Sequence, residues 1–191
     1  TMGLLAGRYK RRWTSGGPRV WLEKAQALYA VADQRFGDSY NGINAATLAL
    51  HLGQLERAQQ FAREVIALLE AVPERSLDHW KIATIAEAWH LVRDLDKARA
   101  RYAQAVRLVP EFYSDIAVMR TQARRNARVL GDSEDVFDDI MTIPRVVVCV
   151  GHLEDAPNRP TPRFPPYLGA AVREAIRARL SGGRSSSWIR A

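Results

Sequence analysis

The stretch WKIATIAEAWHLVRDLDKARARYAQAVRLVP, residues 80–110, contains two helical hydrophobic patterns separated by a short turn. The first pattern repeats at steps of three and four residues, as one face of an α-helix does, and comprises Ile82, Ile85, Ala86, Trp89 and Val92. Asp94 is predicted to cap the second helix, and Pro110 to end it. The predicted buried face of this second helix comprises Leu95, Ala98, Tyr102, Ala105 and Leu108.

Small residues occupy the positions where these two helices would touch if they were antiparallel. Ala86 lies on the first helix, and Ala98 and Ala105 lie on the second. A methyl side chain lets two helices approach closely, while the large Trp89 and Tyr102 fill the space beside the contact. The stretch therefore predicts a tightly packed antiparallel helix pair.

One tetrapeptide pattern marks the second helix of three such pairs. Its copies, 33 and 40 residues apart, are Leu22-Glu23-Lys24-Ala25, Leu55-Glu56-Arg57-Ala58 and Leu95-Asp96-Lys97-Ala98. A short pattern that recurs at this distance is typical of repeat architectures, in which each repeat buries its apolar face against its neighbours. We expect the Leu and the Ala of each copy to be buried and the charged pair to be exposed.

The spacing is similar to that of the tetratricopeptide repeat, a helix pair with small, aromatic and proline residues at fixed offsets. The matching positions are Ile82, Ile85, Ala86, Trp89, Ala98, Tyr102, Ala105 and Pro110. This resemblance implies a mainly α fold, a stack of antiparallel helix pairs over residues 1–142. We expect Gly53 at the turn of the second pair, a short first helix over Met2–Trp13, a capping helix over Tyr113–Leu130 and a short helix over Asp135–Met141.

Residues 143–191 follow a different pattern, which predicts a βα appendage. Arg145–Val150 is an apolar run of strand length, and a helix is predicted from about Tyr167 to Leu180. A loop over residues 151–166 separates them, and a low-complexity tail follows. One strand, one loop and one helix amount to an incomplete Rossmann-like unit.

Two further runs, Gly42–Leu48 and Trp80–Thr84, resemble the TRAF-binding domain. This tetratricopeptide-like module occurs in the apoptosis-signal-regulating mitogen-activated kinase kinase kinases and in bacterial proteins of unknown function. Gly151-His152, Asp155-Ala156-Pro157 and Arg163–Pro166 follow in the order of those bacterial proteins. The resemblance implies a scaffold for protein assembly joined to a nucleotide-sensor-like module.

The sequence contains no recognisable catalytic or cofactor-binding motif. It has neither a Gly-x-Gly-x-x-Gly nor a P-loop motif. His51, His79 and His90 have no second ligand at metal spacing, and Cys149 in an apolar run is typical of an inert core thiol. We therefore expect no enzymatic activity, no cofactor and no metal.

Composition and charge indicate which class of partner and which cellular compartment to expect. The 28 Lys and Arg residues exceed the 21 Asp and Glu residues by seven, but they are scattered among acidic residues, which argues against nucleic acid as a partner. No apolar run has the length of a membrane span and no signal peptide precedes the first helix. These features and the single cysteine predict a cytoplasmic protein, and the oligomeric state stays open.

In a stack of helix pairs the first helices line the concave side. The residues that we expect there, as binding residues for a protein or peptide, are Tyr40, Asn44, Thr47, His51, Trp80, Glu87 and His90. The alternative is that the capping helix of the chain itself fills this surface. A second candidate site comprises His152, Glu154 and Asp155, at the carboxyl end of the predicted strand.

These features favour a non-enzymatic scaffold for protein–protein interaction in signalling or stress-response assembly. The alternative is a fragment of a sensor for a nucleotide-derived ligand, or of a hydrolase, that uses the loop over residues 151–166.

Overall fold

The computed structural model describes residues 2–143 together with Ala171 and Glu174. Contacts divide the chain into two units, Thr1–Ile143 and Pro144–Ala191. Within residues 2–143 the fold is helical and contains no strand. Its elements in chain order are α1 (Met2–Thr14), α2 (Arg19–Phe36), α3 (Ser39–His51), α4 (Leu55–Glu70), the 3-10 helix η1 (Glu74–Ser76), α5 (His79–Leu91), α6 (Leu95–Leu108) and α7 (Tyr113–Leu130).

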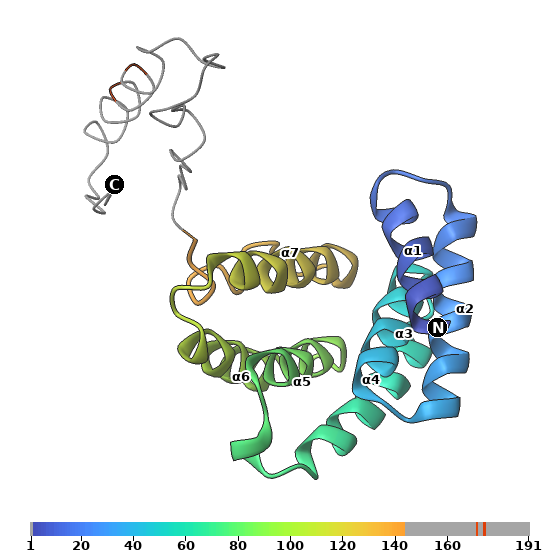
Figure 1. The fold of residues 1–191 in the computed structure, drawn as a ribbon, viewed down its shortest axis with the longest axis horizontal. Coiled ribbons are helices and arrows are strands. Elements are labelled where there is room, and N and C mark those ends of the chain that lie inside the picture. Colours follow the sequence, from blue (N-terminus) through green and yellow to red (C-terminus); the bar gives the residue numbers. More distant parts are fainter. Residues whose placement is uncertain (1, 144–170, 172–173, 175–191) are drawn as a thin grey trace, which may run out of the picture. The chain divides into compact units, whose positions relative to one another are not determined.

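The first six α-helices form three consecutive pairs, α1 with α2, α3 with α4, and α5 with α6 (Figure 1). Each pair also packs on the next, because α2 contacts α3 and α4 contacts α5. This arrangement confirms the predicted stack of tetratricopeptide-like helix pairs. The predicted strand, loop and helix after Pro144, with Cys149, lie outside the described residues.

The alanines of the recurring tetrapeptide lie in the core, as predicted. Ala25, Ala58 and Ala98 have no exposed surface. The prediction that each leucine of the pattern is buried is correct for Leu22 and wrong for Leu55, which is 42% exposed, while Leu95 is only partly buried. Leu22 lies one turn inside α2. Leu55 is the first residue of α4, so it lies outside the contact between α3 and α4.

A similar correction applies at the other end of α6. Leu108, predicted to be buried, is 54% exposed, and the adjacent Val109 is buried in its place. Leu108 is the last residue of the helix, and Val109 has left helical geometry with φ −137° and ψ 52°. The change of backbone direction turns the next side chain toward the core, which periodicity within the helix does not predict.

The absence of a side chain at Gly42 allows α3 to lie close to both of its neighbours. A Cβ atom at this position would lie 2.7 Å from Val65 Cγ2 of α4 and 2.9 Å from Asp33 Oδ1 of α2. Both distances are shorter than side-chain atoms tolerate, so a larger residue would push the helices apart. Gly42 thus helps to join the first and second helix pairs.

The turns within the second and third pairs share one backbone geometry. Gly53 has φ 80°, as its position in the turn predicts, and Arg93 has φ 71° at the equivalent place. This left-handed conformation is unfavourable for a residue with a Cβ atom. Arg93 is held in it while its guanidinium binds both carboxylate oxygens of Asp132, at 2.6 and 2.8 Å. The turn therefore connects the third pair to the segment after α7.

Helix α7 packs on the first helices of the second and third pairs, α3 and α5. Its range is the one predicted for the capping helix, and its buried residues are Ile116, Met119, Ala123, Asn126 and Ala127. The predicted short helix over Asp135–Met141 is wrong, because the chain forms consecutive turns there. Phe137 and Met141 are buried in the core. The backbone of this segment is therefore determined by its packing on the stack and not by helical periodicity.

A charged residue in the seam of the third pair should unfold this module. We expect Ala98→Arg to lower the free energy of unfolding by about 3 kcal/mol or more, since it overpacks the contact and buries an unpaired charge. Urea unfolding followed by circular dichroism at 222 nm measures this. Ala100→Arg is the matched control, because Ala100 is exposed on the same helix. Equal effects of the two substitutions would contradict the seam.

Candidate binding groove

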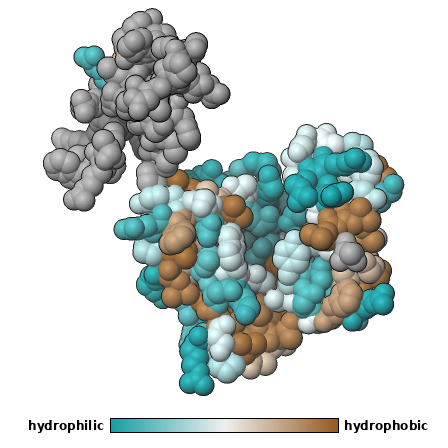
Figure 2. All heavy atoms as spheres, viewed as in Figure 1, coloured by the Kyte–Doolittle hydropathy of each residue, from teal (hydrophilic) through white to brown (hydrophobic). Residues whose placement is uncertain are grey.

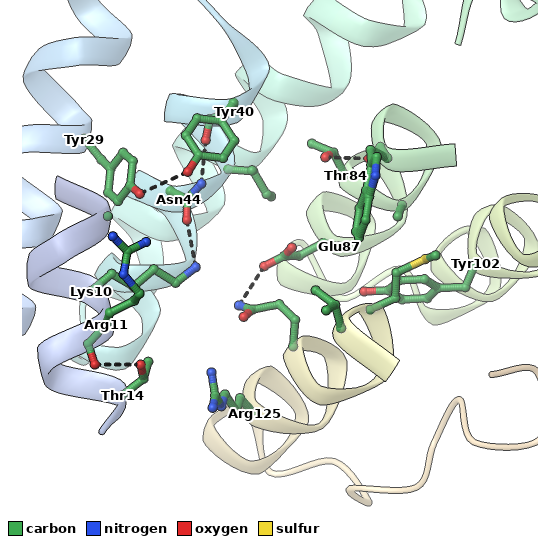
Figure 3. Close-up of a pocket in the computed structure, with 17 residues that line it drawn as sticks. Lys10, Arg11, Thr14, Tyr29, Tyr40, Asn44, Thr84, Glu87, Tyr102 and Arg125 are labelled. Carbon is green, nitrogen blue, oxygen red and sulfur yellow. Dashed lines mark hydrogen bonds between the residues drawn. The ribbon is translucent and has the colours of Figure 1, made fainter. Parts of the chain in front are cut away.

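A groove with a volume of about 530 Å³ lies on the concave side of the stack. Residues of α1, α3, α5 and α7 line it, and Tyr29 of α2 and Tyr102 of α6 add their side chains (Figure 3). Apart from those two, every lining residue belongs to the first helix of a pair or to the capping helix. The groove therefore exists because the pairs stack with their first helices on the same side.

Helix α1 contributes one continuous stripe to this groove. Gly7, Lys10, Arg11 and Thr14 follow the i, i+3, i+4, i+7 spacing of a helix face. Lys10 Nζ donates a hydrogen bond to Asn44 Oδ1 of α3 at 2.7 Å. A Cβ atom at Gly7 would lie 3.8 Å from Arg11 Nη1, so the guanidinium folds over the glycine toward the groove. Lys10 and Arg11 thus place two cations on the side of the groove that α1 forms.

Helix α7 supplies a third cation, Arg125, on the opposite wall (Figure 3). Burial lowers the pKa of the Lys10 amine, and of the two charges that act on it Glu87 raises that pKa while Arg125 lowers it. Lys10 and Arg125 are therefore close enough for their charges to repel one another. Neither residue has a carboxylate partner within 4.0 Å among the described residues.

Glu87 joins three helices through one carboxylate oxygen. Its Oε1 accepts hydrogen bonds from Gln122 Nε2 at 3.1 Å and Asn126 Nδ2 at 3.0 Å, both on α7. The Thr47 hydroxyl of α3 donates to the same oxygen. Because Thr47 and Asn126 are buried, the carboxylate satisfies donors that water does not reach. Glu87 is thus a structural link as well as a groove residue.

Two aromatic side chains form an edge of the groove. Tyr40 is 60% exposed and Trp80 is 42% exposed, both near the start of their helices. The Tyr40 hydroxyl lies 3.4 Å from that of Tyr29, and the two rings meet edge to face at 6.0 Å. Burial and this contact raise the pKa of Tyr29, so its hydroxyl stays protonated. The edge offers apolar surface beside hydrogen-bonding groups.

Four of the seven residues predicted for the concave side line the groove: Tyr40, Asn44, Trp80 and Glu87. The other three do not. Thr47 is buried beneath the groove, where its hydroxyl donates a hydrogen bond to Glu87. His51 packs edge-on against Trp13 of α1 with ring centroids 5.0 Å apart.

The prediction that His90 is a binding residue on the concave side is wrong. Its side chain has no exposed surface, and its Nε2 atom lies 3.0 Å from Asp132 Oδ2. The Phe137 ring meets it edge to face at 5.0 Å. Asp132 and Phe137 belong to the turns after α7, which cover this part of α5. Helical phase places His90 one turn after Glu87, but the long-range packing of that segment buries it.

Sequence reasoning missed the residues from the two ends of the described chain, above all Lys10, Arg11, Gln122 and Arg125. A signal was present in α1, since Gly7, Lys10, Arg11 and Thr14 share one helix face. The alternative that the capping helix fills the concave surface is partly right. Helix α7 covers α3 and α5 in part, and its remaining side chains become a wall of the groove.

The loop candidates His152, Glu154 and Asp155 lie outside the described residues, so their predicted role stays a prediction. Within residues 2–143, no group of three or more His, Cys, Asp or Glu side chains is placed to hold a metal ion. In the same part of the chain, no helix combines the length and the apolarity needed to cross a bilayer.

Comparison with known proteins points to the same class as the fold. The sequence model of a family described as TPR-S, Tetratricopeptide Repeats-Sensor, matches residues 1–49, which cover α1, α2 and most of α3. No curated protein matches the chain. Residues 2–143 form a tetratricopeptide-like helical module, a class that typically binds proteins or peptides. The resemblance to the TRAF-binding domain stays a prediction.

Removing the Glu87 carboxylate should loosen α7 from the stack. We expect Glu87→Ala to lower the free energy of unfolding by about 2–4 kcal/mol, because the buried Thr47 and Asn126 donors lose their acceptor. Urea denaturation measures this value. The control is Glu111→Ala, at an exposed position outside the groove, which should change stability by less than about 0.5 kcal/mol. A similar effect at both sites would rule out the linking role.

Stability should fall between pH 6.5 and pH 4 because of His51. Burial lowers the pKa of His51 to about 4, and Lys10 and Arg125 add to this effect. The unfolded chain, with a histidine pKa near 6.5, therefore binds the proton first, and folding weakens as the pH falls through this range.

In His51→Gln, the loss of stability over that range should be smaller than in the wild type by about 1–2 kcal/mol, less than the full pKa difference since the ring is partly exposed. Unfolding curves at a series of pH values give this difference. Parallel pH dependences of the two proteins would show that His51 does not titrate in this way.

Proposed function

We propose that this chain is a non-enzymatic interaction scaffold that binds a peptide or an extended protein segment in the groove between α1, α3, α5 and α7. The observation that carries this proposal is the groove itself, a concave surface with an exposed aromatic edge and polar walls. Exposed aromatic residues at the edge of a concave surface supply contact area at a low cost in side-chain entropy.

Apolar residues elsewhere on the drawn face are a weaker indication of a binding site than the groove. On the face drawn in Figure 2, apolar residues of the described part occur as separate patches among hydrophilic ones. Single exposed apolar side chains are normal on proteins and do not define an interface. The groove combines concavity, aromatic groups and hydrogen-bonding groups, and therefore fits a specific partner best.

We further propose that the partner belongs to a signalling or stress-response assembly in the cytoplasm. The description of the matched family as tetratricopeptide repeats-sensor supports such a role, as does the resemblance of Gly42–Leu48 to the TRAF-binding domain. A single cysteine is typical of a reducing compartment.

Selection of displayed random peptides against the purified full chain tests the groove. Enriched peptides should bind in solution, and Tyr40→Ala and Trp80→Ala should each weaken binding about tenfold or more, because each removes an aromatic contact. Phe112→Ala is the matched control, an equally exposed aromatic residue that does not line the groove. Failure to enrich any peptide, or equal affinity for all three variants, would contradict the proposal.

A further inference from the structure

Arg125 differs from the other arginines of α7, which have acidic partners. Arg120 and Arg124 both bind Asp138, and Arg128 binds Glu134. Lys10, Arg11 and Arg125 line the groove instead, and none of them has an acidic partner within 4.0 Å in residues 2–143. Their positive charges are thus available to a ligand.

The acidic groups of the groove do not neutralise these cations. Glu87 is the one carboxylate among the residues that line it, and its Oε1 atom already accepts hydrogen bonds from Thr47, Gln122 and Asn126. Three cations against one carboxylate leave the groove with a net positive charge. Burial lowers the pKa of Lys10, and Glu87 raises that pKa while Arg125 lowers it, so Glu87 acts on this amine against the repulsion from Arg125.

We propose that the groove selects an acidic peptide. A carboxylate of the peptide binds between Lys10 and Arg11 on α1 and Arg125 on α7, and a neighbouring apolar side chain packs against Tyr40 and Trp80. This inference rests on the proposed function, since it specifies the chemistry of the peptide bound at the same site.

A carboxylate is the anion that the side chains of an unmodified peptide supply. A phosphoryl group carries close to two negative charges, and in this groove it would be near the Glu87 carboxylate as well as the three cations. Because attraction and repulsion both scale with the charge of the ligand, charge alone does not distinguish the two anions, and the test below includes both. Arginine also binds a planar carboxylate through two parallel hydrogen bonds, which suits Arg11 and Arg125.

The test uses the tightest peptide selected against the full chain, labelled with an uncharged dye, and an analogue in which every Glu and Asp is replaced by Gln or Asn. Fluorescence anisotropy should show about tenfold or greater weakening for the neutral analogue, since charge-assisted hydrogen bonds are lost. Lys10→Gln and Arg125→Gln should each weaken binding of the acidic peptide about tenfold, and barely affect the neutral analogue.

A charge-matched control separates the groove from the general positive charge of the chain. Arg107→Gln removes one charge at an exposed position on α6 that does not line the groove, and it should change the affinity less than twofold. Thermal unfolding of each variant confirms that the groove is intact. Equal losses in all three variants would show non-specific attraction and overturn the proposal.

The two proposals fail in different ways. If selected peptides bind the groove but contain no acidic residue, or if the neutral analogue binds equally well, the acidic peptide is wrong and the interaction module stands. If a phosphoserine analogue binds about tenfold more tightly than the carboxylate peptide, and inorganic phosphate displaces both, the proposal that the groove selects a carboxylate is wrong. If no peptide depends on Tyr40 and Trp80, the proposed function itself fails.

Discussion

The close approach of two helices at an alanine is the contact on which the rest of this structure depends. Ala25, Ala58 and Ala98 have no exposed surface, and each lies in the second helix of its pair. A methyl group keeps the two backbones near one another, so that the large side chains beside it interdigitate. The pairs stack with their first helices on one side, and that side becomes the groove.

The capping helix α7 is held on this concave side by polar contacts as well as by apolar packing. Glu87 accepts hydrogen bonds from two side chains of α7, and Asp132 binds both His90 and Arg93. Arg93 has a positive φ where the second pair has a glycine, so the backbone is strained to keep this arginine next to Asp132. The helix that ends the stack is thereby also a wall of the groove.

The fold was largely predictable because its signals are local. Helical periodicity and caps predicted the range of α7, and they predicted the ends of α1 and α6 to within about two residues. The errors have a common cause, since Leu55 and Leu108 lie at helix ends, and His90 lies beneath a segment distant in sequence that includes the turns over residues 135–141. Burial at such positions depends on which part of the chain packs over them, and periodicity within one helix does not contain that information.

Spacings of three and four residues in the sequence specify the helix pairs, their alanine seams and the side of the stack on which the first helices lie. Only the tertiary structure decided the composition of the groove. Lys10 and Arg125 come from the first and the last helix of the described chain, and they meet across the groove because α7 folds back onto α3 and α5. That return is set by long-range contacts such as those of Glu87 and Asp132, which no local pattern encodes.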